Sequence, residues 1–236
     1  MTNTQASIDF FDNLKKSLSA SRFSGYHQRG DEADALAKYL WNTRICEALY
    51  PSLQMLEVTF RNRVHSAVGK TSGDPTWLKN EIGFLPPEEK EFITKAKETL
   101  RRDRCPVTED YLVSEMKFGF WTSLLNAKYD RMWHKLLPTV FPRIPLRIRT
   151  RGDVSVLMNK VRRLRNAAMH HHSIWHWQDL QQSHQDVRLL ISYMCIQTDL
   201  MAEKTDRFPE IYSNGIGDCQ KLVSQMLKQI QPPPAN

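Results

Sequence analysis

The sequence has few of the residues that break helices or build strands. Only nine of its 236 residues are glycine, and it lacks the runs of β-branched residues that are typical of strands. Leu, Ala, Lys, Glu, Gln and Met instead fill the segments between predicted turns, and these residues favour helices. We therefore predict an all-α protein.

Cysteine and long apolar runs are also scarce. The four cysteines (Cys46, Cys105, Cys195 and Cys219) lie far apart and form no Cys-x-x-Cys pair, which argues against a disulfide framework or a zinc ribbon. The apolar stretch at 189–196 is too short to span a bilayer. The first residues are polar and lack the apolar segment of a signal peptide. We expect a cytoplasmic protein with reduced thiols and no membrane partner.

The spacing of apolar residues predicts the order of the helices. They are expected over 7–19, 31–69, 87–103, 109–115, 118–138 (as one helix or a pair), 147–170, 179–205 and 218–230. Pro51 permits either a break or a fresh start within the second of these. Hydrophobic residues make up 41% of the chain, enough for a sizeable core, and no internal repeat divides it. We predict a single helical domain over 1–236 with a frayed tail at Pro232–Pro234.

The charge of the chain is positive and concentrated. The net charge is +7. The stretch 143–165 contains only one acidic residue, Asp153, and eight basic residues: Arg143, Arg147, Arg149, Arg151, Lys160, Arg162, Arg163 and Arg165. Such a run can be only a solvated face. Arginine, however, pairs bidentately with phosphate oxygens, which favours RNA as the partner. We predict that the RNA-binding residues are Arg143, Arg147, Arg149, Arg151, Arg162 and Arg163.

The basic run leads into a group of residues suited to RNA cleavage. Asn166 and His170 are four residues apart and share one helix face, so the amide can orient the imidazole. Arg165 and His170 are five apart, which is about 140° around an ideal helix. Either the helix is distorted there, or two copies of the chain pool their residues across a dimer axis.

These residue types match the chemistry of phosphodiester cleavage by a 2′-hydroxyl. Histidine titrates near neutrality and acts as base or acid, whereas arginine stays cationic and stabilises charge on the phosphate oxygens. We predict Arg165, Asn166 and His170 as catalytic residues that need no metal and no cofactor. The alternative is a charge cluster at a helix end without catalytic function.

A metal site near the histidines is the weaker hypothesis. His172 and His176 are four apart, and Asp179 is the only carboxylate close to them in sequence. The three could act together only if a helix already began at His172, but the segment 173–175 has the composition of a loop.

Four stretches resemble the Abi-like (abortive infection) proteins of the HEPN superfamily, in the order expected for that family. They are Tyr39–Asn42, Leu56–Asn62, Phe118–Trp121 with Trp133 downstream, and Leu164–His171, which is similar to the family signature Arg-Asn-x-x-x-His-His. The resemblance covers residues 22–202; 203–236 contains a C-terminal helix and tail. The family often has a Glu-Pro-like pair after the histidines, where this chain has His172–Trp175.

The resemblance implies a HEPN-like helical bundle with additional N- and C-terminal helices. It also implies an endoribonuclease of a phage-defence or toxin–antitoxin system, working as a homodimer and controlled by an antitoxin that is protein or RNA. It adds His171, Glu57, Arg61 and Asn62 as supporting site residues, although Glu57 and Arg61 are also spaced for a simple ion pair.

Two alternatives to a nuclease remain at this point. One is a non-catalytic RNA-binding module, and the other is a nucleotide-binding module that acts through a partner. No glycine-rich phosphate loop supports the second. Phe118, Phe120, Trp121 and Trp133 are predicted to be core residues rather than a stacking platform for bases, while Trp175 and Trp177 fit either role.

Overall fold

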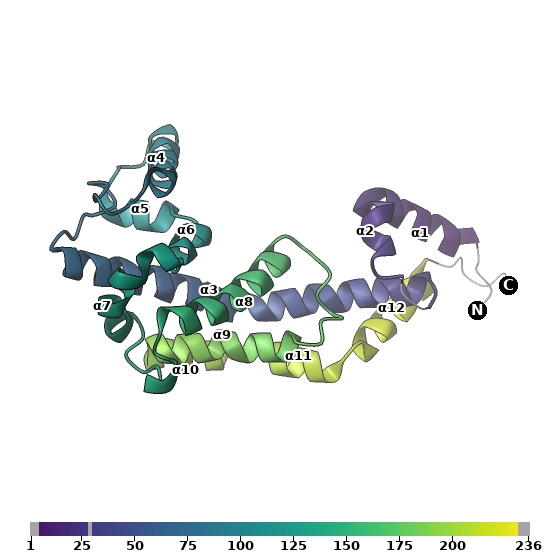
Figure 1. Cartoon of the computed structure of the whole chain (residues 1–236). Helices are drawn as coiled ribbons and strands as arrows, with labels where there is room; N and C mark the ends of the chain where they lie inside the picture. Colours follow the sequence, from purple (N-terminus) through teal and green to yellow (C-terminus); the bar gives the residue numbers. More distant parts are fainter. Residues whose placement is uncertain (1–4, 28–29, 231–236) are drawn as a thin grey trace. The chain divides into compact units, whose positions relative to one another are not determined.

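Every regular element of the computed structural model, which describes residues 5–27 and 30–230, is helical (Figure 1). The α-helices are α1 (Gln5–Leu18), α2 (Ala20–Ser24), α3 (Glu32–Ser72), α4 (Pro87–Arg102), α5 (Glu109–Glu115), α6 (Phe118–Ser123), α7 (Asp130–Val140), α8 (Arg151–Met169), α9 (Leu180–Met194), α10 (Ile196–Thr205), α11 (Phe208–Asn214) and α12 (Gly217–Gln229). Two short 3-10 helices are η1 (Ala127–Tyr129) and η2 (Leu146–Ile148). The predicted all-α class is confirmed.

None of these helices, over the described ranges, is both long enough and apolar enough to cross a membrane. The predicted tail at Pro232–Pro234 lies outside the described residues.

The chain divides into two compact units. Among the described residues, unit 1 comprises 5–27, 30–50, 164–181 and 206–230, and unit 2 comprises 51–163 and 182–205. The chain therefore passes from one unit to the other four times, and three of these passages lie inside the helices α3, α8 and α9. A boundary inside a helix has no loop-like composition, so the sequence contains no linker signal that would reveal it.

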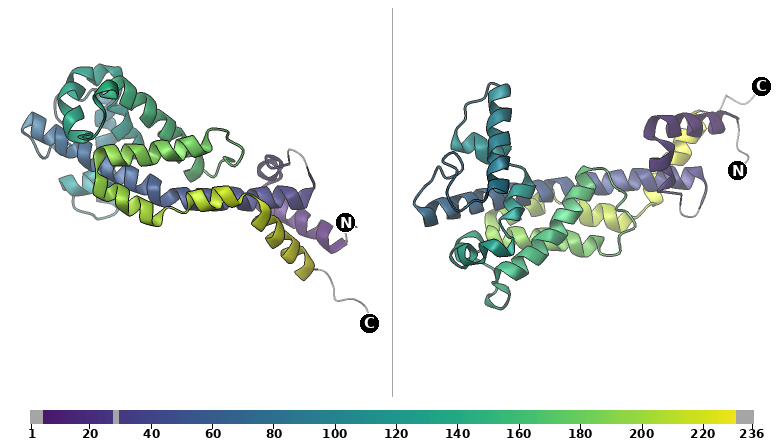
Figure 2. Two further views of the ribbon diagram at one scale, coloured as in Figure 1. Left: turned by 90° about the horizontal axis from the view of Figure 1, so that it is seen from below. Right: turned by 45° about the horizontal axis from the view of Figure 1, so that its top comes forward.

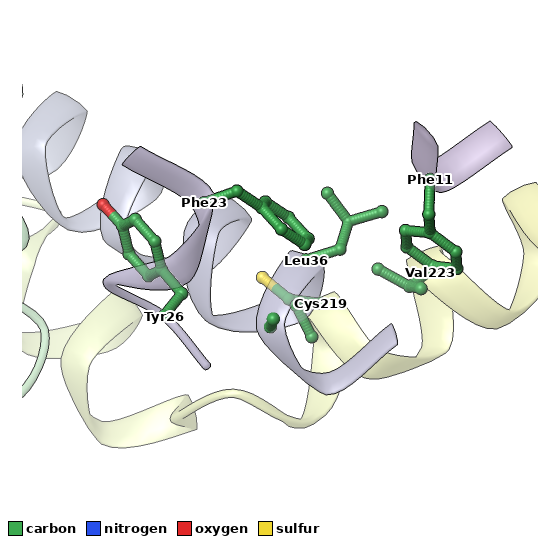
Figure 3. Close-up of a cluster of buried hydrophobic side chains, with 8 residues drawn as sticks. Phe11, Phe23, Tyr26, Leu36, Cys219 and Val223 are labelled. Atoms are coloured by element: carbon green, nitrogen blue, oxygen red, sulfur yellow. The ribbon is translucent and has the colours of Figure 1, made fainter. Parts of the chain in front are cut away.

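Unit 1 is held together by a small apolar core between its N-terminal and C-terminal helices. Phe11 from α1, Phe23 from α2 and Leu36 from α3 are buried with Cys219 and Val223 from α12 (Figure 3). This cluster explains why helices at opposite ends of the sequence belong to the same unit, since each would otherwise expose its apolar face.

Unit 2 has an aromatic core. Trp77, Phe120 and Trp121 are fully buried; the Trp77 ring stacks on Phe120 at 6.4 Å and meets Trp121 edge to face at 6.2 Å. The indole N–H groups of Trp77 and Trp121 donate to backbone carbonyls, which satisfies the polar end of each buried ring. Phe118 and Trp133 are buried as well. The predicted core role of these aromatic residues is confirmed.

One carboxylate ties the connection after α3 to α5. Glu109 accepts hydrogen bonds from the backbone N–H groups of Leu78 (3.0 Å) and Lys79 (2.9 Å), and His65 Nε2 lies 2.7 Å from its Oε1. The Glu109 carboxylate thus serves as the hydrogen-bond acceptor for two backbone N–H groups of the segment after α3.

Pro51 neither breaks nor restarts a helix, because it lies inside α3, which is one continuous helix of 41 residues. Proline costs a helix one N–H donor and adds a clash with the preceding turn. The helix nevertheless buries side chains on both sides of this position, including Leu49 and Leu53, and that packing outweighs the local cost.

The single helix predicted over 179–205 is wrong: the chain turns back at Cys195. In a continuous helix Arg188 and Asp199 would lie about 16 Å apart along the axis. Instead, Arg188 Nε donates to Asp199 Oδ1 at 2.9 Å, and the views in Figure 2 show α10 running back along α9. Arg188 also donates to the Asp199 carbonyl, so this ion pair holds the hairpin closed. The apolar spacing continues across the turn, which is why periodicity alone joins the two helices.

Candidate functional site

The helix that carries the predicted catalytic residues begins at a well-formed cap. The hydroxyl of Thr150 accepts from the Asp153 N–H at 3.0 Å and donates to the Asp153 carboxylate at 2.6 Å, so the pair closes the first turn of α8. The helix is therefore shorter than the predicted 147–170. Val161, Leu164 and Ala168 are buried, while Leu157 is only half-buried.

The same helix ends at the histidines, in a Schellman motif. The N–H of His172 donates to the Ala167 carbonyl at 2.8 Å, and the N–H of His171 donates to the Ala168 carbonyl at 3.2 Å. This pattern needs a left-handed residue, and His171 adopts it with φ of 58°. Glycine usually fills that position, because a side chain there costs about 1–2 kcal/mol. As a result, the side chains of His170, His171 and His172 are all exposed at the helix end.

The loop after the histidines is held by a buried amide that sequence reasoning did not select. Asn42 of α3 is only 5% exposed. Its Oδ1 accepts from the N–H groups of Ile174 (2.7 Å) and Trp175 (3.1 Å), and its Nδ2 donates to the His172 carbonyl (3.2 Å). Asn42 thus fixes the backbone on the far side of the histidine turn. Its place in the stretch Tyr39–Asn42, singled out by the resemblance, was the one available signal.

Aromatic residues hold the same loop from a second direction. The Trp175 ring packs at 6.3 Å from Trp41, and the Lys38 ammonium lies 5.4 Å above it. Trp41 in turn stacks on Tyr212 of α11. These contacts resolve the ambiguity over Trp175, which anchors the loop instead of presenting a free stacking face.

A buried tyrosine reaches the loop as well. Tyr26 is 3% exposed and forms a side-chain hydrogen bond with Ser173. Burial raises the pKa of the Tyr26 phenol, and the Ser173 bond opposes only part of that rise. The phenol is therefore neutral at physiological pH and serves as a hydrogen-bonding anchor.

Arg165 and Asn166 lie one turn before the histidines. Arg165 Nη1 donates to Asn166 Oδ1 at 3.4 Å, and the Asn166 side chain is exposed. The amide oxygen thus interacts with the guanidinium, whereas we expected the amide to orient the imidazole of His170. Because Asn166 shares a helix face with His170, this contact draws the Arg165 guanidinium toward that face.

The helix is not distorted between these residues. Regular α-helix continues to Met169, and the N–H of His170 still donates to the Asn166 carbonyl at 2.9 Å. Of the two arrangements that the five-residue spacing allows, a distorted helix is therefore ruled out for this chain. The long Arg165 side chain and a second copy of the chain remain as ways of bringing arginine and histidine together.

The histidines do not form a metal-binding cluster within the described residues. No group of three or more His, Cys, Asp and Glu side chains there is placed to hold an ion. The His170 and His172 rings are 6.4 Å apart, and His176 Nδ1 instead lies 3.3 Å from the Ser173 hydroxyl.

The supporting residues taken from the resemblance belong to unit 2. Arg61 Nη1 donates to the Ser114 carbonyl at 3.4 Å, which links α3 to α5. Glu57 is half-buried, and Asn62 is exposed. Their participation in a site with Arg165 stays a prediction.

Two of the predicted RNA-binding arginines have structural partners instead. Arg151 donates to the Asp130 carboxylate and to the Leu125 carbonyl, both at 2.8 Å, which joins α8 to α7 and the segment before it. Arg149 is half-buried and donates to the Ile144 carbonyl. These contacts give both guanidinium groups a structural role, and their part in RNA binding stays a prediction. The exposed members of the set are Arg143, Arg147, Arg162 and Arg163.

The importance of the Asn42 clamp can be measured directly. Asn42→Leu leaves the N–H groups of Ile174 and Trp175 without this acceptor and should lower the free energy of unfolding by about 2–4 kcal/mol. Urea unfolding followed by circular dichroism measures this. Thr43→Val is the control: Thr43 is an exposed neighbour whose hydroxyl bonds only within its own helix, so its change should stay below about 0.5 kcal/mol. Equal stabilities for the two variants would contradict the clamp.

The four cysteines are free, and they should differ in reactivity. Hydrogen bonds from Thr198 lower the pKa of Cys195, and the largest contribution comes from the Thr198 side chain. A hydrogen bond from the Arg63 side chain also lowers this pKa. Burial raises the pKa of Cys46 to about 11 and also raises that of Cys219. At pH 7, iodoacetamide should therefore modify Cys195 at least about tenfold faster than Cys46, as peptide mapping by mass spectrometry would show. Comparable rates at the two thiols would refute the assignment.

Comparisons with known proteins add no relative. No protein-family model matches the chain, and neither a curated protein nor a solved structure matches it. The function is therefore argued from the residues and their geometry.

Proposed function

We propose that this protein is an endoribonuclease of a phage-defence or toxin–antitoxin system, that it cleaves RNA without a metal ion, and that its fold is of the HEPN type. The observation that carries the proposal is the end of α8, where a Schellman turn exposes three consecutive histidines. In the preceding helical turn, the Arg165 guanidinium donates a hydrogen bond to the Asn166 side chain. Asn42 holds the backbone of this turn from the other side. Fixed backbone around exposed catalytic groups is what a nuclease needs.

In the proposed reaction, His170 removes the proton from a ribose 2′-hydroxyl. The 2′-oxygen forms a bond to the adjacent phosphorus while the bond from phosphorus to the 5′-oxygen breaks. Arg165 stabilises the charge that develops on the phosphoryl oxygens. A second imidazole, from His171 or from another copy of the chain, donates a proton to the leaving 5′-oxygen. The products are a 2′,3′-cyclic phosphate and a 5′-hydroxyl.

The proposed unit is a homodimer. On a regular helix, Arg165 and His170 point about 140° apart, so two chains related by a two-fold axis beside the helix end would bring two Arg–His sets together without bending either helix. An antitoxin, protein or RNA, would control the enzyme by covering the histidine turn.

The decisive experiment uses purified protein and a labelled RNA oligonucleotide, with and without EDTA. Cleavage that persists in EDTA and leaves 2′,3′-cyclic phosphate ends supports the proposal. A substrate with a 2′-O-methyl group at the cleaved position should resist, because it lacks the nucleophile. RNA that is bound but stays intact would instead support a non-catalytic RNA-binding module, and cleavage that EDTA abolishes would contradict the metal-free mechanism.

Binding of RNA should depend on salt through the exposed arginines. Reversing the charge of Arg143, Arg147 and Arg162 together should reduce the slope of log affinity against log salt by about 2, since each phosphate contact on a single strand contributes about 0.7. Fluorescence anisotropy at several KCl concentrations measures the slope. Lys204→Glu, a reversal at an exposed side chain on α10, is the control. An equal change in the control, or none in the triple variant, would mean that the run is only a solvated face.

A further inference from the structure

Unit 2 contains a cavity that the proposed nuclease does not use. Its volume is about 490 Å³, and it lies between the end of α3, the loop at 83–86, η1 and α7. Cavities of roughly 300–1,000 Å³ commonly hold small organic ligands. The cavity is therefore large enough for a compound of moderate size.

The walls of the cavity are mainly apolar. Phe84 and Tyr129 meet edge to face, with ring centroids 6.3 Å apart, and Leu85, Met132 and Leu136 continue the surface. Phe84 remains 39% exposed although it lines the cavity. A ligand with an apolar body would cover this ring and gain the contacts that water cannot provide.

The two cations that line the cavity differ in their partners. Lys128 Nζ lies 2.7 Å from the Glu89 carboxylate and 5.2 Å from the centre of the Tyr129 ring, so its charge is already compensated. Arg131 is exposed and has no ion pair or hydrogen bond among the described residues. The cavity therefore combines an apolar wall with one uncompensated guanidinium.

The remaining ionisable group of the wall adds no negative charge. Burial raises the pKa of the Tyr129 phenol, and the neighbouring Glu89 carboxylate raises it further. The phenol is neutral at physiological pH and does not repel an anion. With Glu89 paired to Lys128, Arg131 decides the sign of the charge that the cavity prefers.

We propose that this cavity binds a small organic monoanion, an aromatic or aliphatic body that carries one carboxylate or sulfonate. The body lies against Phe84, Tyr129 and Met132, and the anionic group pairs with Arg131. The largely apolar lining offers few hydrogen-bonding partners for a base or a sugar, which favours this class over nucleotides.

A pair of fluorescent probes tests both parts of the proposal. Anilinonaphthalene sulfonate has an aromatic body and one negative charge, and N-phenyl-1-naphthylamine has nearly the same body without the charge. Both should bind the intact chain saturably. Arg131→Ala should weaken the sulfonate about fivefold or more and leave the neutral probe within about twofold, because an exposed ion pair contributes about 1 kcal/mol.

Two further variants control the interpretation. Lys135→Ala removes a positive charge one turn further along α7 that does not line the cavity, and it should change neither affinity. Met132→Trp fills the cavity and should weaken both probes about tenfold or more; an unchanged thermal transition would show that it folds. Absence of saturable binding to the intact chain, or unchanged binding to Met132→Trp, would overturn the cavity as the site. Equal losses for the two probes in Arg131→Ala would overturn the preference for an anion.

Discussion

Replacement of His170 by alanine is expected to lower the rate of RNA cleavage about 10²–10⁴-fold, the usual contribution of a positioned general acid or base. The measurement is the initial rate on a labelled RNA oligonucleotide. His170 stands at the end of a regular helix whose backbone is held by the Schellman turn and by Asn42, so its removal should leave the fold unchanged. Circular dichroism checks this.

The neighbouring histidine is the main complication of that experiment. His171 is also exposed and can replace the missing base in part. The double variant should therefore combine His170→Ala with His171→Gly, because glycine adopts the left-handed conformation of residue 171 without strain. His176→Ala is the matched control, since His176 is exposed on the same loop and lies outside the signature. Wild-type rates in the single and the double variant would show that the site assignment is wrong.

Arg165→Ala should lower the maximal rate of cleavage about 10²–10³-fold, the loss typical for removal of a group that stabilises transition-state charge. Arg165→Lys should recover only part of this, because an ammonium cannot match two phosphoryl oxygens at once. Arg162→Ala is the comparison on the same helix: it should weaken RNA binding and its salt dependence while the maximal rate is kept. Equal effects of Arg162→Ala and Arg165→Ala on the maximal rate would contradict a catalytic role for Arg165.

The same variant tests whether two chains share a site. Arg165→Ala protein mixed with His170→Ala protein should regain part of the activity once subunits exchange, because one mixed site then contains an intact arginine and an intact histidine. Sedimentation at micromolar concentration should show about twice the mass of one chain. A protein that stays monomeric and still cleaves RNA would refute the shared site.

Local sequence patterns were sufficient for most of the helices. The spacing of apolar residues indicated where helices lie, and this signal depends only on neighbours along the chain. The patterns missed α2 and α11, which have five and seven residues. They also missed the reversal at Cys195, which depends on the Arg188–Asp199 pair across the hairpin.

The candidate site also has features that the sequence indicates and features that only the structure shows. Arg165, Asn166 and His170 could be chosen from residue type and spacing, because the chemistry of a group and its position around a helix are local properties. The clamp by Asn42 could not, since it joins residues about 130 positions apart in the sequence. The separation of structural from exposed arginines was equally hidden, because Arg151 shows no difference from Arg147 until Asp130 is placed beside it.

The sequence by itself therefore determined that this protein is all-helical and basic, and it selected the residues with the chemistry for RNA cleavage. Tertiary structure decided which of those side chains are exposed, which are used to hold the fold, and that an uncompensated arginine lines an apolar cavity. The physical reason is that helix propensity and residue chemistry are properties of short segments, whereas burial and pairing depend on segments brought together from distant parts of the chain.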